Sequence, residues 1–92
     1  MSGLKEHLPG EDLIRQGLSD LADGRETIPA LLVSIGAPRL QSAGLKIGRT
    51  LPEADHRLYF LLSREFGDDA HSQYNALLRR LVSFEQALEC AS

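Results

Sequence analysis

Two short stretches of this sequence combine histidine with carboxylates, the residue types used for metal binding and for general acid–base catalysis. They are DH at positions 55–56 and DDAH at 68–71. We expect them at the starts of two successive antiparallel helices, and a four-turn helix would hold them about 20 Å apart. Only Glu65, Asp69 and His71 could then converge. A metal site needs three or four converging ligands, so these three residues would be the minimum. The sequence predicts no metal site and no cofactor.

The segment REFGDDAH, residues 64–71, resembles the arginine-to-histidine spacing of the small helical ribonucleases called HEPN domains. The resemblance implies an RNA-cleaving site formed across a dimer, with Arg64 and His71 as its catalytic residues. It covers this segment alone. It also departs from the family, because Gly67 and Asp68 interrupt the helix that carries both residues there.

A basic segment lies in the middle of the chain. Residues 28–52 carry Arg39, Lys46 and Arg49 and no acidic residue. Helix, a break at Gly36-Ala37-Pro38, a short second helix ending at Gly44 and a basic loop together suggest a helix-turn-helix. The three cations would then face phosphates. The short second helix offers few side chains to read base edges, and the net charge of the whole chain is −3. Nucleic-acid binding through residues 28–49 is therefore an alternative function.

The last third of the chain has the most regular pattern. Apolar residues recur at alternating steps of four and three, at Ala70, Tyr74, Leu77, Leu81, Phe84, Leu88 and Ala91. This spacing predicts an amphipathic helix. Leu78 and Val82 lie beside this stripe and make the apolar face of the helix wider on one side. We expect most of the stripe to be core. Leu78 and Val82, with Tyr74 and Phe84, are the predicted partner interface, and a second copy across a two-fold axis is the simplest partner.

The first half of the chain carries clear helix boundaries. Pro9 opens the first helix, and Gly24 is placed to end it. Gly17 lies within its apolar stripe, where a glycine allows another helix to approach closely. Thr27 can cap a second helix that is apolar nearly all round, which predicts a central, buried element. A buried strand is the rival interpretation of IPALLV, but no second strand is available to pair with it.

The second half predicts the remaining elements. Thr50 and Glu53 form a capping box that begins the fourth helix, and Gly67 ends that helix. Its apolar face consists of Leu58, Tyr59, Leu61, Leu62 and Phe66. Asp68 or Asp69 caps the last helix.

The predicted fold is all-α. It is a compact bundle of four main helices plus one short helix, with short antiparallel connections. The predicted core is Leu13, Leu18, Leu21, Leu31, Leu32, Ile35, Leu58, Leu61, Leu62, Tyr74, Leu77, Leu81, Phe84 and Leu88.

Size and composition set outer bounds. Ninety-two residues predict one domain over 1–92, with residues 1–8 frayed. Cys90 is the only cysteine, which excludes an internal disulfide and fits a reducing compartment. The first residues lack the apolar run of a signal peptide, and no stretch predicts a membrane span. We expect a cytoplasmic protein.

These observations favour one function over its alternatives. The residues show no convergent catalytic set, while apolar helical surface is in surplus. The sequence predicts a non-enzymatic helical interaction module, a regulatory or accessory protein that forms a homodimer or binds another protein. Nucleic-acid binding is the first alternative, and an HEPN-like RNA-cleaving domain is the second.

Overall fold

The computed structural model describes residues 10–91, and every regular element in that range is helical. The elements are α1 (Glu11–Ala22), α2 (Ile28–Ser42), α3 (Ala54–Phe66), the 3₁₀ turn η1 (Gly67–Asp69) and α4 (Ala70–Ala91). The all-α prediction is confirmed. The expected fraying of residues 1–8 lies outside the described residues.

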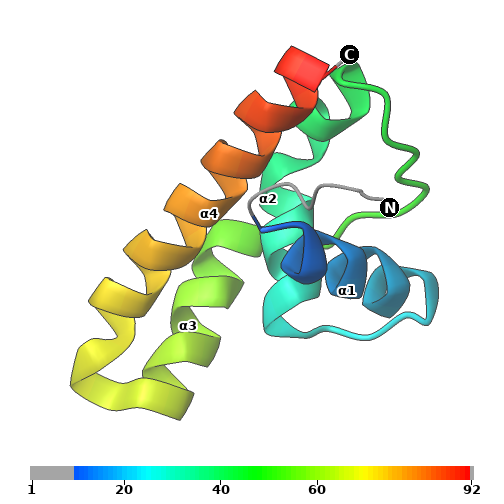
Figure 1. Ribbon diagram of the computed structural model, residues 1–92. Coiled ribbons are helices and arrows are strands. Elements are labelled where there is room, and N and C mark those ends of the chain that lie inside the picture. Colours follow the sequence, from blue (N-terminus) through cyan, green and yellow to red (C-terminus); the bar gives the residue numbers. More distant parts are fainter. Residues whose placement is uncertain (1–9, 92) are drawn as a thin grey trace.

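The helix α2 occupies the middle of the molecule (Figure 1). It packs against α1 on one side and against the α3–α4 hairpin on the other. Residues 30–33 of α2 are fully buried. This confirms that IPALLV is a central helix and not a strand. Its amphipathicity is low because neighbours cover it on several sides.

The separate short helix predicted after Pro38 does not exist. α2 is continuous from Ile28 to Ser42 and contains Pro38 in its interior. Proline removes one helical hydrogen bond and crowds the preceding turn. Here the apolar residues on both sides of it, Val33, Ala37 and Leu40, are buried in one core, and Pro38 itself is exposed. Burial on both sides of the proline holds the helix together.

The predicted start of the fourth helix is wrong, whereas α4 begins at Ala70, directly after Asp69, where the last helix was predicted to start. Thr50 lies in the connection 43–53, and α3 begins at Ala54, after Glu53 in a left-handed conformation with no side-chain cap. Pro52 explains the shift, because the residue before a proline avoids the helical region. At the start of α4, the Asp69 carboxylate accepts a hydrogen bond from the side-chain amide of Gln73 at 2.8 Å.

The glycine stops are confirmed, whereas Pro9, predicted to open the first helix, lies outside the described residues. α1, α2 and α3 end where Gly24, Gly44 and Gly67 follow with positive φ, the conformation that favours glycine after a helix. Short connections join α1 to α2 and α3 to α4. The connection 43–53 is long, so the prediction of short connections throughout is wrong there.

A buried carboxylate fixes the corner between α1 and α2. The Thr27 hydroxyl accepts from the Ala30 backbone N–H at 3.2 Å, which confirms the predicted cap. The same hydroxyl donates to Asp20 at 2.6 Å, and the Gln16 amide donates to Asp20 at 2.9 Å. Asp20 is 3% exposed. The Thr27 hydrogen bond, more than any other contact, holds the pKa of Asp20 below its ordinary value.

The core prediction is partly confirmed. The buried members of the predicted set are Leu21, Leu31, Leu32, Leu58, Leu62, Leu81 and Phe84. The rest are only partly buried against that core: Leu13, Leu18, Ile35, Leu61, Tyr74, Leu77 and Leu88. The prediction missed Ile14, Val33 and Leu40, each 1% exposed or less. Since α2 has neighbours on several sides, its core residues do not follow a single stripe.

Candidate functional site: the outer face of the helical hairpin

Large apolar side chains are exposed on one part of the described chain. They are Tyr59 at 39%, Phe60 at 66%, Phe66 at 45% and Val82 at 41% exposed. The first three belong to α3 and the last to α4. α3 is covered on the side of Leu58 and Leu62, so the aromatic residues beside them face outward. Of the apolar face predicted for this helix, Leu58 and Leu62 are buried, whereas Tyr59 and Phe66 are exposed.

A hollow of about 400 Å³ lies on α3 next to α4. Its lining residues are Asp55, His56, Tyr59, Phe60, Ser63 and Tyr74. The Tyr59 ring packs edge-on against Tyr74, with ring centroids 5.4 Å apart, and against His71 at 6.4 Å. These are favourable geometries for aromatic pairs. They fix the Tyr59 ring, and they leave Phe60 beside it standing out from the surface.

A second hollow of about 610 Å³ lies along α4. Its lining residues are Asn75, Leu78, Arg79, Val82 and Ser83. Tyr74, Leu78 and Val82 follow one another at steps of four, so they lie one above another on one side of α4. Tyr74 lines the first hollow, and Leu78 and Val82 line the second. We call the residues that line the two hollows the hairpin face.

The structure separates the four residues predicted as a partner interface. Leu78 and Val82 line the hairpin face. Tyr74 also lines this face and is partly buried. Burial, with a smaller contribution from the charge of Asp55, raises the pKa of the Tyr74 hydroxyl. Phe84 is 4% exposed and belongs to the core. Sequence reasoning missed Phe60, because an aromatic residue beside a buried stripe is more often covered than exposed.

Among the described residues, no hydrogen bond or ring contact joins the two residues predicted for RNA cleavage. Arg64 lies in the last turn of α3 and His71 in the first turns of α4, with η1 between them. The His71 ring packs against Tyr59, and Arg64 is exposed. In the same part of the chain, no group of three histidine, cysteine or acidic side chains is placed to hold a metal ion. Glu65, Asp69 and His71 are not among such a group.

The basic segment is divided between two roles. The Arg39 guanidinium donates to both oxygens of Glu89 at 3.1 and 3.2 Å and lies 3.5 Å from Glu85. It therefore ties α2 to α4. Lys46 and Arg49 stand in the connection 43–53. The helix-turn-helix predicted for residues 28–49 has no turn, because α2 is continuous where the turn was expected.

Glu85 is a buried charge that sequence reasoning missed. It is 4% exposed, and a Cβ atom at Gly36 would lie 2.8 Å from its carboxylate, so α2 and α4 approach closely here. The sequence contains a signal for this burial, because Glu85 lies four residues after the buried Leu81, on the same side of the helix, and one after the buried Phe84. Burial raises the pKa of Glu85, although Arg39 opposes the shift. Compared with the unfolded chain, the folded protein therefore binds the proton of Glu85 more tightly.

This raised pKa sets a pH dependence. A carboxyl whose pKa is higher in the folded state contributes stability below its unfolded value, near 4.5, and loses that contribution as pH rises through the folded value. We expect Glu85→Gln to be more stable than the wild type at neutral pH. The difference should vanish below the unfolded value, where Glu85 is protonated in both states. Urea unfolding of both proteins across this pH range measures it. An advantage that persists in acid would assign the effect to packing rather than to charge.

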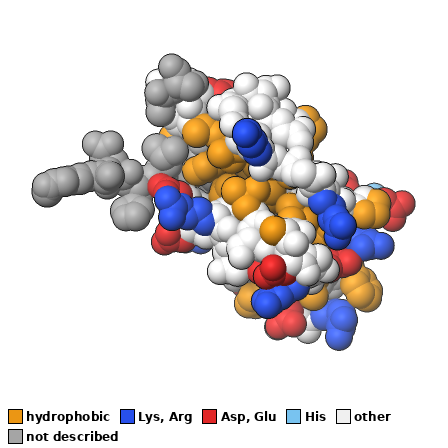
Figure 2. Space-filling model, turned by 90° about the vertical axis from the view of Figure 1, so that its right-hand side faces the viewer, with side chains coloured by type: hydrophobic (Ala, Val, Ile, Leu, Met, Phe, Trp, Pro, Cys, Tyr) orange, Lys and Arg blue, Asp and Glu red, His pale blue; other side chains and the backbone are white. Residues whose placement is uncertain are grey.

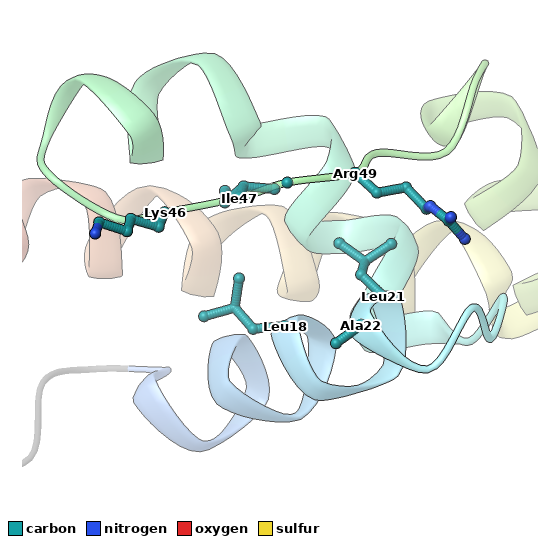
Figure 3. Close-up of a pocket in the computed structure, with 7 residues that line it drawn as sticks. Leu18, Leu21, Ala22, Lys46, Ile47 and Arg49 are labelled. Carbon is teal, nitrogen blue, oxygen red and sulfur yellow. The ribbon is translucent and has the colours of Figure 1, made fainter.

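A third hollow lies on the side of the molecule away from the hairpin. α1 and the connection 43–53 form its walls, and its volume is about 380 Å³. Figure 2 views this side, where hydrophobic side chains gather at the centre of the face with both basic and acidic side chains around them. We call this hollow the α1–loop pocket (Figure 3).

Comparison with known proteins gives no relative. No protein-family model, no curated protein and no solved structure matches this chain. Among the described helices, none has the length and apolarity needed to cross a bilayer.

Proposed function

We propose that this chain is a non-enzymatic interaction module, a regulatory or accessory protein that binds a second protein chain through its hairpin face. One observation carries the proposal. Every large hydrophobic side chain that is markedly exposed in the described range lies on α3 or α4. Exposed apolar side chains that gather on one part of a surface mark interaction sites. The single cysteine of the sequence supports a reducing compartment such as the cytoplasm.

A second copy of the same chain is the first partner to test. In a two-fold dimer each residue of the face is used twice, so one Phe60 supplies two buried rings. Covering a phenylalanine side chain contributes about 2 kcal/mol. Aromatic residues and arginine are enriched where binding energy concentrates, and the hairpin face presents Tyr59, Phe60 and Arg79. In such a dimer, exposed side chains of one copy would fill the hollows on the face of the other copy.

The test measures mass against concentration. Size-exclusion chromatography with light scattering, over about a hundredfold range of concentration, gives the dissociation constant of the dimer. Phe60→Asp and Val82→Asp place a charge on the hairpin face at exposed positions, and each should raise that constant about a hundredfold or more. Ala76→Asp is the matched control, because it adds the same charge to an exposed position of α4 outside the face.

The outcomes separate cleanly. A dimer that the two face variants abolish and the control keeps supports the proposal. A dimer that survives both face variants places the interface elsewhere. A monomer at every concentration contradicts self-association. Circular dichroism of each variant checks that the helices remain.

A further inference from the structure

The α1–loop pocket has an apolar floor. Leu18 and Leu21 of α1 point toward the connection 43–53, and Ile47 lies across from them (Figure 3). Leu21 is 5% exposed, while Leu18 and Ile47 are partly buried against the core. Ala22 lines the same pocket with a small side chain. The volume of about 380 Å³ lies within the range of small-molecule sites.

Hydrogen bonds hold the loop wall of the pocket in place. The Gln41 amide at the end of α2 donates to the Ile47 carbonyl at 2.9 Å. A few residues further on, the Leu51 backbone N–H donates to the Ser34 hydroxyl at 3.0 Å. Both anchors belong to α2, the central helix. The pocket is therefore formed between fixed elements and does not need a ligand to assemble it.

Two cations flank the apolar floor. Lys46 and Arg49 lie at opposite ends of the labelled loop segment, with Ile47 between them (Figure 3). Both are exposed, and within the described part of the chain neither has an ion pair. Gly48 leaves the space between them open, since a Cβ atom there would meet nothing within 4 Å.

The carboxylates at the end of α1 do not neutralise these cations. Asp20 is turned inward to the Thr27 hydroxyl, and Asp23 pairs with Arg25 at 3.9 Å. Residues 28–52 contain no acid. A partly exposed apolar floor, flanked by two cations that have no ion pair among the described residues, is complementary to a molecule with a hydrocarbon part and an anionic group.

We propose that the α1–loop pocket binds a small amphipathic anion, a carboxylate with a hydrocarbon chain. The chain lies on Leu18, Leu21 and Ile47, and the carboxylate accepts hydrogen bonds from Lys46 or Arg49. Bonds between ionised partners are stronger than neutral ones, and the guanidinium matches a carboxylate in shape. This site lies on α1 and the 43–53 connection, so it does not depend on the hairpin face.

The experiment titrates ¹⁵N-labelled full-length protein with decanoate at submicellar concentrations and follows the backbone amide signals by NMR. Saturable shifts are expected at Leu18, Leu21 and Ala22 and along residues 46–49. Decanol has the same chain without the charge, and acetate has the charge without the chain. Decanol should bind more weakly than decanoate, and acetate should leave these signals unchanged.

A charge-reversed protein tests the cations directly. The double variant Lys46→Glu with Arg49→Glu should weaken decanoate binding about tenfold or more, because each carboxylate contact becomes a repulsion. Arg64→Glu is the matched control on the opposite part of the molecule and should bind as the wild type does. Both variants change exposed side chains, and circular dichroism verifies their fold.

Three results would overturn the proposal. One is the absence of saturable shifts with decanoate. Another is a set of shifts centred on the hairpin face instead of the pocket. The third is equal binding of decanol and decanoate together with an unchanged affinity of the double variant, which would mean that the cations take no part.

Discussion

Replacing Gly17 with alanine is expected to lower the free energy of unfolding by about 2 kcal/mol. A Cβ atom at this position would overlap the Pro29 carbonyl oxygen and the Val33 side chain, and it would lie 2.8 Å from the Pro29 carbonyl carbon. The Pro29 backbone cannot turn aside as a side chain can. Overpacking a well-packed contact costs about 1–3 kcal/mol or more, against a gain of about 1 kcal/mol in helix propensity.

Two other glycines provide matched controls for this prediction. Gly36→Ala would bring a Cβ atom to 2.7 Å from Leu81 Cδ1 and 2.8 Å from the Glu85 carboxylate, both ends of side chains that can move. We expect a smaller loss there. Gly48→Ala meets nothing within 4 Å and should be neutral or slightly stabilising. Urea unfolding followed by circular dichroism ranks the three. If Gly17→Ala were as stable as Gly48→Ala, α1 and α2 would not be in backbone contact.

The same glycine shows which parts of the fold the sequence predicts well. Gly17 stands in an apolar stripe, and the inference that another helix approaches it is confirmed by the position of Pro29. Thr27 and Gly24 are likewise confirmed as a cap and a stop. In each case the responsible interaction lies within a few residues along the chain, or depends on the absence of one side chain.

Predictions failed where distant segments decide the outcome. The burial of Glu85 was not predicted, and Arg39 was expected to face phosphates. The two lie 3.5 Å apart, and they belong to helices far apart in the sequence. No local pattern indicates such a pair, because it depends on how α2 and α4 meet.

The hairpin face was predictable in part for a related reason. Leu78 and Val82 are apolar residues that lie outside the regular stripe of α4, and the sequence alone shows this. Tyr59 and Phe60 cannot be assigned in the same way. Which side of α3 is covered depends on where α2 and α4 lie. The α1–loop pocket was not foreseen at all, because its walls come from α1 and from a connection that follows α2.

Replacing Pro38 with alanine is expected to raise the free energy of unfolding by about 2 kcal/mol. α2 continues through Pro38, but Pro38 has no backbone N–H. The Ser34 carbonyl therefore lacks the donor that a helix normally supplies. A proline inside a helix costs about 3 kcal/mol, and the loss of its restraint on the unfolded chain returns less than about 1 kcal/mol. Position 38 is exposed, so alanine removes little core packing.

Pro29 is the internal control for this prediction. It lies in the first turn of the same helix, where a backbone N–H has no helical partner to lose. Pro29→Ala should therefore lower stability slightly, through the greater freedom of the unfolded chain. Opposite signs at the two prolines would show that α2 tolerates Pro38 at a cost met by burial on both sides. If Pro38→Ala brought no gain, the ring would contribute through the hollow that it lines with Ile47 and Gly48. It would then help to hold the 43–53 connection against α2.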